Sequence, residues 1–295
     1  MRVSVVGATG NLGRHLCEEL QANGHLVDPI VRGECDLAEP HREQLYRLRD
    51  RLTAFDAHLC FNAAAYTDVD GAEREPDRAF LVNALGAELV ARAADDAGST
   101  MCHISTDFVF AGDARRPYDE FDLPGPLSTY ARSKRAGEEL VMRATRRCFV
   151  VRVGGLYGQG GGNFFSTLVA RLRAGQTLRL DGERQVSPTW TRALAQQLIV
   201  LCERGEHGIY HATCQGATTW YDFATALCDE AAALGLTLPR SFSKVASSEL
   251  PTVAARPAMS LLEPHMLRLR GLLRIPQWRD ALRGYLHELI TAGQI

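Results

Sequence analysis

The chain begins with a β-branched apolar run that leads into three evenly spaced glycines, Val3-Ser4-Val5-Val6-Gly7-Ala8-Thr9-Gly10-Asn11-Leu12-Gly13. Leucines recur at helical spacing over residues 12–22, so the stretch predicts a strand, a tight turn and a helix. The glycine spacing differs by one position from the GxGxxG turn of dinucleotide-binding folds, and it occupies the place where that turn belongs. Glycines there would let the backbone approach a pyrophosphate, while the first N–H groups of the helix point at the anion. The expected contacts are Gly7, Thr9, Gly10, Asn11, Leu12 and Gly13.

Apolar runs and amphipathic stretches alternate through the first half of the chain. After residues 2–6, apolar runs end near Val31 and cover 58–61, 100–104 and 149–153, and helical stretches cover 41–53, 76–97 and 129–144. Such alternation is typical of a parallel sheet with helices on both faces. We therefore predict an α/β protein with a Rossmann-type, doubly wound parallel sheet.

The second half of the chain has a less regular pattern. A glycine cluster runs from Gly154 to Gly162, helices are expected near 164–174 and 191–204, and the pattern beyond residue 212 is mainly helical. We predict a dinucleotide-binding domain at 1–153, to which residues 189–211 return. A smaller, mainly helical substrate-binding domain is expected at 154–295.

The composition excludes several classes of protein. With 46% hydrophobic and 23% charged residues, the chain is typical of globular proteins rather than disordered ones. A net charge of −2 argues against a strongly basic nucleic-acid binder. No segment offers the roughly 18 uninterrupted apolar residues of a membrane span, the first apolar run is too short for a signal peptide, and the cysteines lack CxxC spacing. We expect a cytoplasmic protein that binds neither nucleic acid nor membrane.

The end of the second predicted strand carries a cation. Dinucleotide folds that use NAD place a carboxylate there to bind the ribose 2′-OH, whereas this strand ends Pro29-Ile30-Val31-Arg32. A guanidinium can pair with the 2′-phosphate of NADP. The sequence therefore predicts Arg32 as a cofactor contact and NADPH as the preferred cofactor, with NADH as an alternative. The competing interpretation is that Arg32 is one of many surface arginines.

Lysine is scarce in this chain, and one of its two lysines belongs to a motif. Among 33 basic residues only Lys134 and Lys244 are lysines, and the first ends the sequence Tyr130-Ala131-Arg132-Ser133-Lys134. Residues i and i+4 share a helix face, so this phenol and this ammonium can point into one cleft. We expect the cation to lower the pKa of Tyr130 and so to fit the phenol for proton transfer. The alternative is an ordinary exposed helical lysine.

Two hydroxyls and a carboxylate follow the predicted strand over residues 100–104, in Ser105-Thr106-Asp107. The carboxyl edge of a parallel sheet is where ligands bind. A hydroxyl there could hydrogen-bond a substrate oxygen as charge develops on it. Capping or turn formation would be the ordinary role of such residues.

Together these motifs resemble the extended short-chain dehydrogenase/reductase superfamily, and within it the dTDP-4-dehydrorhamnose reductase family. The resemblance covers nearly the whole chain. Beyond the motifs above, it includes Asp36-Leu37, Asn62 to Asp70, Pro117 to Glu120, Ser187 to Trp190, Gly208 to His211 and Arg256 to Ser260. So many matches in order are more specific than any single motif.

The resemblance implies a reaction and a role for each matched residue. Tyr130 would protonate the oxygen of the reduced carbonyl, Lys134 would hold the nicotinamide ribose, and Thr106 would bind the carbonyl oxygen. The reaction would be hydride transfer to C4 of a dTDP-4-keto-6-deoxyhexose, as in dTDP-rhamnose biosynthesis. Further cofactor contacts would be Asp36, Leu37, Ala63, Ala64, Ala65 and Tyr66, and further substrate contacts would be Val69, Asn163 and Trp190.

Relatives of that family suggest other activities. Sugar dehydratases that resemble this chain use an Asp-Glu pair after the threonine, whereas Asp107 precedes Phe108, which moves no proton, so dehydration is disfavoured. A nucleotide-sugar epimerase would use the same Tyr and Lys. A non-catalytic, NADP-binding subunit, similar to the regulatory subunit of methionine adenosyltransferase, would keep the same pocket. Retention of Thr106, Tyr130 and Lys134 favours an enzyme, while both alternatives stay open.

The resemblance also bears on metal binding and assembly. Some family members bind magnesium through acidic residues at a dimer interface, but His15 stands where one such acid is expected, so we predict no metal. A homodimer is left as an alternative to a monomer. Glu183-Arg184-Gln185 replaces the Asp-Gln pair that usually precedes the Pro-Thr element, which leaves the stereochemistry of the sugar open.

Overall fold

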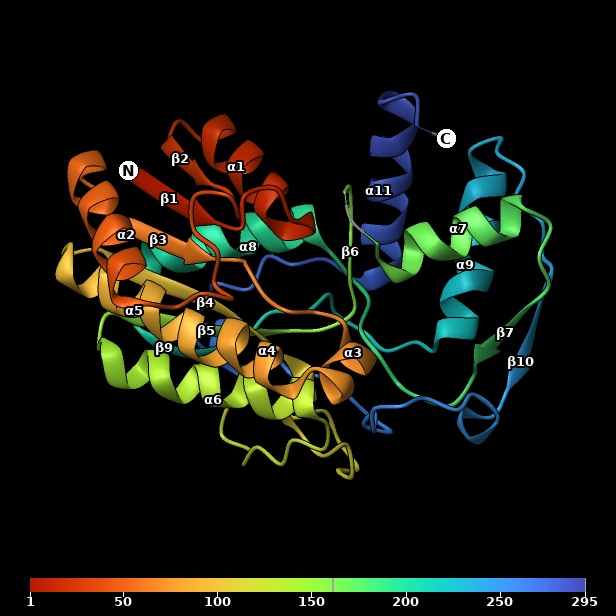
Figure 1. Cartoon of the computed structure of the whole chain (residues 1–295). Coiled ribbons are helices and arrows are strands. Elements are labelled where there is room, and N and C mark those ends of the chain that lie inside the picture. The colour runs from red at the N-terminus through yellow and green to blue at the C-terminus, as the bar shows by residue number, and fades with distance from the viewer. Residues whose placement is uncertain (161, 295) are drawn as a thin grey trace.

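The centre of the protein is a six-stranded sheet of order β2-β1-β3-β4-β5-β9, in which every neighbouring pair is parallel (Figure 1). The structure, a computed structural model, describes residues 1–160 and 162–294, so residues 161 and 295 of the predicted substrate domain lie outside the described residues. The strands are β1 (Arg2–Val6), β2 (Leu26–Ile30), β3 (Leu59–Asn62), β4 (Thr100–Thr106), β5 (Cys148–Val153) and β9 (Gly208–His211). The strand order reverses between β1 and β3, and ligands of such sheets bind at the carboxyl ends of the strands at this reversal.

Helices cover both faces of this sheet (Figure 1). Strand β1 shows why, since Val3 and Val5 face one hydrophobic core and Val6 faces the other, and all three are buried. The first core is covered by α1 (Asn11–Ala22) and α8 (Thr191–Arg204), and the second by α2 (Arg42–Phe55), α5 (Gly86–Asp96) and α6 (Thr129–Ala144). The predicted doubly wound α/β fold is confirmed.

The single helix predicted over residues 76–97 is divided into three parts. Helix α4 (Pro76–Phe80), which follows α3 (Val69–Arg74), leads into a π-helical turn, η1 (Leu81–Leu85), and then into α5. In this turn Asn83 accepts a hydrogen bond from the N–H of Tyr66 at 2.9 Å and donates one to the hydroxyl of Ser133 at 2.9 Å. Isolated π-turns are frequent at functional sites. This one ties the segment after β3 to helix α6.

A smaller group of elements stands beside the carboxyl ends of the sheet (Figure 1). It comprises β6 (Leu156–Tyr157), α7 (Phe164–Arg173), β7 (Leu178–Asp181), β8 (Thr189–Trp190), α9 (Trp220–Ala233), β10 (Phe242–Val245) and α11 (Trp278–Thr291). Its core is aromatic: Tyr157 stacks on Phe165, and both rings meet Tyr285, with centroids 4.8–5.8 Å apart. Strand β10, which the sequence did not predict, pairs with β7 and packs Phe242 against Tyr221.

The chain returns to the sheet after it has passed through this smaller group. Helix α8 packs against the same core as α1, and β9 pairs with β5 at the edge of the sheet. The short elements η2 (Asp107–Val109), η3 (Ser247–Glu249) and α10 (His265–Leu269) complete the fold. The division of the chain at residue 153 stays a prediction. No helix in the described part of the chain is long and apolar enough to cross a membrane.

Candidate active site

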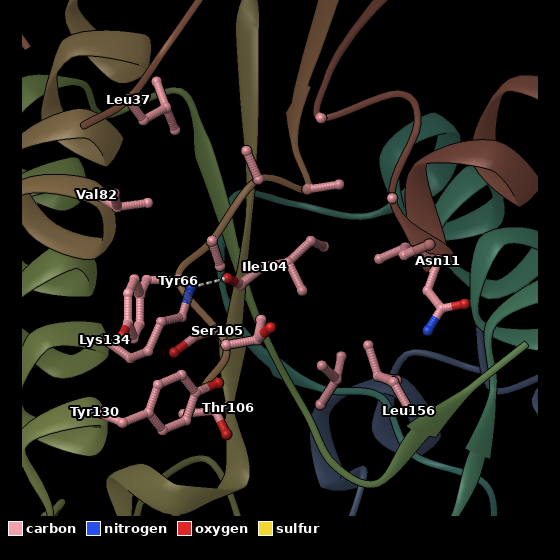
Figure 2. A pocket seen from close by; sticks show the side chains of 18 of the residues that line it. Asn11, Leu37, Tyr66, Val82, Ile104, Ser105, Thr106, Tyr130, Lys134 and Leu156 are labelled. Atoms are coloured by element: carbon pink, nitrogen blue, oxygen red, sulfur yellow. Dashed lines mark hydrogen bonds between the residues drawn. The ribbon is translucent and has the colours of Figure 1, made fainter. Parts of the chain in front are cut away.

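A cavity of about 640 Å³ opens at the carboxyl ends of the central strands, where the strand order reverses. It gathers nearly all the residues that the sequence analysis singled out. They are Gly7, Thr9, Gly10, Asn11, Leu12, Arg32, Asp36, Leu37, Ala63, Ala64, Ala65, Tyr66, Val69, Thr106, Tyr130, Lys134 and Asn163. Segments far apart in the chain therefore meet at one site (Figure 2).

Two of the predicted contacts do not line this cavity. A Cβ at Gly13 would lie 2.1 Å from the carbonyl oxygen of Gly7, so Gly13 permits close packing of α1 on the turn instead. Trp190 packs edge-on against His15, and its ring is tilted against that of Tyr285. Its indole is part of the packing between the sheet core and the aromatic core.

The glycine turn forms one end of the cavity. Gly7 has φ +83°, and a Cβ on it would lie 2.7 Å from the amide nitrogen of Ala64, so no larger residue fits there. Helix α1 begins directly afterwards at Asn11, whose side chain points into the cavity in Figure 2. Its Oδ1 is buried and has no hydrogen-bond partner among the described residues. The first N–H groups of α1 and Oδ1 of Asn11 can both bind a polar ligand, and the glycines leave room for it near the backbone. These features suit a dinucleotide.

The opposite, deep end of the cavity holds Thr106, Tyr130 and Lys134. Ser128 caps α6 by accepting from the N–H of Ala131 at 3.2 Å, which places Tyr130 in the first turn of the helix. The phenol of Tyr130 and the hydroxyl of Thr106 lie together in Figure 2, and Thr106 acts to lower the pKa of the phenol. One helical turn on, Nζ of Lys134 donates to the carbonyl oxygen of Ile104 at 2.5 Å.

The pKa values of this pair correct one expectation from the sequence. Burial raises the pKa of Tyr130 to about 12, and the carboxylate of Asp107 adds to the rise. The prediction that Lys134 lowers the pKa of the phenol is therefore wrong for this structure. The reason is that burial dominates, while the ammonium is turned toward the strand carbonyl. Burial also lowers the pKa of Lys134 to about 8, against the opposing charge of Glu138.

Asp107 is a second buried carboxyl at this end. It accepts a hydrogen bond from Oγ1 of Thr106 at 2.9 Å, and burial raises its pKa to about 6 in spite of that bond and one from Ser260. Asp107 belongs to the motif Ser105-Thr106-Asp107, but no catalytic or binding role was predicted for it from the sequence. Its place directly after β4, at the carboxyl edge of the sheet, was the available signal.

A buried ion-pair network links the elements that carry the deep end of the cavity. Glu138, on α6, accepts two hydrogen bonds from Arg152, on β5, both at 2.9 Å. It also accepts from the hydroxyl of Ser105, on β4, at 2.6 Å. Burial alone would raise the pKa of Glu138, but Arg152 outweighs it and the pKa is lowered. The helix that carries Tyr130 is thus tied to the strand that carries Thr106.

The outer end of the cavity is charged and exposed. Nε of Arg32 lies 3.2 Å from a carboxylate oxygen of Asp36, and Arg78, on α4, lines the same end. The pKa of Asp36 is lowered, because its hydrogen bonds from Ala38 and Arg32 outweigh the effect of burial. The cavity therefore runs from a solvated cationic rim to a buried acid/base group.

A sequence model of the RmlD substrate binding domain matches residues 1–291 of the chain. The chain belongs to this family.

Relatives in the RmlD family match over their full length. The dTDP-4-dehydrorhamnose reductase of Salmonella typhimurium is 32% identical over 306 residues, which cover 100% of both chains. A protein of Streptomyces antibioticus, named a probable dTDP-4,6-dihydroxy-2-methyloxan-3-one 4-ketoreductase, is 35% identical over 99% of this chain and 97% of its own. The dTDP-4-dehydrorhamnose reductase of Bacillus anthracis, solved in complex with NADP, has a TM-score of 0.88 at 33% identity, over 97% of this chain and 99% of its own. The family predicted from the motifs is confirmed.

Several residues line the cavity of this RmlD-family chain without having been predicted. Seven of them lie at the carboxyl end of β4 or β5 or directly after it, which is the signal that could have found them. They are Cys35, Thr67, Arg78, Val82, Ile104, Ser105, Asp107, Phe108, Val153, Gly154, Gly155, Leu156 and Gly162. Among the described residues, no group of three or more His, Cys, Asp and Glu side chains is placed to hold a metal ion.

Proposed function

We propose that this protein is an NADPH-dependent oxidoreductase that reduces the C4 keto group of a dTDP-4-keto-6-deoxyhexose in deoxysugar biosynthesis. The observation that carries the proposal is the joining, in one cavity, of a glycine turn at one end and Thr106, Tyr130 and Lys134 at the other. Relatives that cover the whole chain are named dTDP-4-dehydrorhamnose reductase and 4-ketoreductase, and one of these reductases was solved with NADP.

The residues of the cavity fit such a dinucleotide. The first N–H groups of α1, at Asn11 and Leu12, would hold the pyrophosphate, while Gly7 and Gly10 let the backbone approach it. Leu37 and Val82 lie on the same side of the cavity in Figure 2, one above the other, where the adenine would lie against apolar side chains. Lys134 would turn from the carbonyl of Ile104 to the hydroxyls of the nicotinamide ribose. The reduced cofactor supplies the hydride when it is bound.

The chain itself supplies the proton. With a pKa of about 12, Tyr130 keeps its proton at neutral pH and can donate it to the oxygen that becomes an alkoxide. Thr106 would hydrogen-bond that oxygen as its charge develops. Lys134, with a positive charge one helical turn away, would stabilise the phenolate that remains.

The proposed sugar contacts come from both halves of the chain. Val69 and Asn163 line the cavity and are the proposed sugar contacts. Asn163 also caps α7 by accepting from the N–H of Ser166 at 3.0 Å, so it would present its remaining polar capacity to the sugar. We propose that residues 1–153 and 189–211 bind the cofactor and that the rest provides most of the nucleotide-sugar site. Assembly into a homodimer is an open proposal that sedimentation velocity would test.

The test mixes the purified protein with NADPH and a dTDP-4-keto-6-deoxyhexose and follows the absorbance of the reduced cofactor. Oxidation of one NADPH for each 4-hydroxy sugar formed is the expected result. A sugar product without net oxidation would identify an epimerase. Tight NADPH binding with no turnover across a panel of keto sugars would identify a non-catalytic binding subunit.

A further inference from the structure

Two arginines from separate elements line the outer end of the cavity. Arg32 lies in the loop after β2, where the sequence analysis expected a cation. Arg78 lies on α4, more than forty residues later in the chain, and lines the same cavity. Nothing in the sequence predicts that the two arginines lie near each other, because Arg78 is one of several charged residues around a short helix.

Both guanidiniums have only weak partners in this structure. Arg32 reaches Asp36 through a single contact at 3.2 Å, and its side chain is 67% exposed. Arg78 reaches Glu75 through a single contact at 3.4 Å, and its side chain is 47% exposed. Exposed single-contact ion pairs contribute little to stability. Each side chain can therefore turn to a stronger anion that arrives in the cavity.

Asp36 contacts Arg32 and lines the same cavity as Arg78. Its Oδ1 accepts from the N–H of Ala38 at 3.0 Å, and its Oδ2 faces Arg32. Burial would raise the pKa of Asp36, but the Ala38 and Arg32 hydrogen bonds and the charges of both arginines outweigh it. Arg78 is thus close enough to act on the same carboxylate as Arg32.

We propose that Arg78 and Arg32 together bind the 2′-phosphate of NADPH, and that Asp36 between them limits the preference over NADH. This inference rests on the proposed use of NADPH. A phosphate monoester carries about −1.5 to −2 charges at pH 7, which two guanidiniums match better than one. A carboxylate at this place repels that phosphate but accepts the ribose 2′-OH of NADH. The three side chains would therefore set the cofactor preference together.

The test measures binding of two fragments, adenosine 2′,5′-bisphosphate and AMP, by titration calorimetry with the full chain. Wild type should bind the bisphosphate more tightly than AMP. Arg78→Ala should weaken the bisphosphate by roughly tenfold, the cost of one charge-assisted contact, and leave AMP unchanged. The matched control is Arg74→Ala on α3, whose side chain is 62% exposed and pairs with Asp68. It should change neither affinity.

A second variant tests the balancing role of the carboxylate. Asp36→Asn keeps the shape of the side chain and removes the charge that opposes the phosphate. It should tighten the bisphosphate by a few-fold and weaken AMP slightly, because the ribose 2′-OH of AMP loses a charged acceptor. The proposal is overturned if Arg78→Ala weakens both fragments equally or neither, or if wild type binds neither or does not discriminate between them. Because no keto sugar is present, a failure of the proposed reduction would leave these results unaffected.

Discussion

Each end of the cavity combines cationic and acidic side chains, but the two ends differ in their exposure to solvent. At the deep end Tyr130 is half-buried and Lys134 and Asp107 are buried, and desolvation moves their pKa values to about 12, 8 and 6, in that order. At the outer end Arg32 and Arg78 are in contact with solvent. Desolvation therefore gives the deep end its acid/base properties, whereas the exposed end acts only through binding. Substitutions should accordingly have large effects at the deep end and modest ones at the rim.

Removal of the phenolic hydroxyl should have the largest effect. Tyr130→Phe should lower kcat by about 10²–10⁴-fold, the usual contribution of a positioned general acid, with little change in the Kd for NADPH. Steady-state kinetics and fluorescence titration of the cofactor measure the two quantities. Tyr46→Phe, at a partly exposed tyrosine of α2, is the control and should be silent. A kcat near wild type in Tyr130→Phe would remove the phenol from the mechanism.

Lys134→Arg should come next. A guanidinium is broader than the ammonium that reaches the carbonyl of Ile104, and overpacking of a buried site costs about 1–3 kcal/mol. We expect lower stability to urea, weaker NADPH binding and a reduced kcat together. Lys244→Arg, at the exposed lysine of β10, should keep all three. Full activity in Lys134→Arg would show that any cation suffices.

Asp107→Asn should stabilise the protein at neutral pH. The folded pKa of about 6 lies above the ordinary value of 3.8, so the cost of the buried charge is absent below pH 3.8 and grows until the pH passes 6. Above that pH it amounts to roughly 3 kcal/mol, at 1.36 kcal/mol for each pKa unit, which the variant would recover. At pH 5 the gain should shrink to roughly half.

Urea unfolding at pH 7.5 and pH 5 measures this difference, with Asp96→Asn at an exposed position as the control. A gain that is the same at both pH values would mean that the carboxyl of Asp107 is not desolvated. Such a result would weaken the contrast between the two ends of the cavity.

The smallest effect is expected at the rim. Arg32→Ala should raise the KM for NADPH by about tenfold, since one charge-assisted contact is lost, and leave the KM for NADH unchanged. Arg47→Ala, at another exposed arginine with an i, i+4 carboxylate partner, should leave both constants unchanged. If the ratio of the two KM values stays the same in Arg32→Ala, Arg32 has no part in cofactor preference.

The deep end was largely predictable from the sequence because its residues occupy motifs with fixed backbone geometry. The spacing of Tyr130 and Lys134 on one helix, and the place of Thr106 after a strand, require only regular structure. The direction of the Tyr130 pKa shift was not predictable in the same way. It depends on how completely the phenol is buried and where the ammonium points, which no spacing reveals.

The rim was less predictable because its residues meet only through tertiary structure. Arg32 was found from its place at a strand end, but Arg78 comes from a helix that the sequence analysis merged with α5. The placement of Trp190 also depends on tertiary structure. A motif resemblance suggested substrate contact, while its neighbours His15 and Tyr285 place the ring in the packing between two cores.

The return of the chain to the sheet at β9 limits how the molecule can be cut or recombined. A fragment ending at Val153 would lack α8 and β9, so one sheet face would keep only α1 of its two covering helices and β5 would become an open edge prone to aggregation. Exchange of sugar specificity between relatives therefore cannot use a single fusion point. It requires grafting two separate segments, one between β5 and α8 and one after β9, while the intervening strand and helix stay with their own sheet.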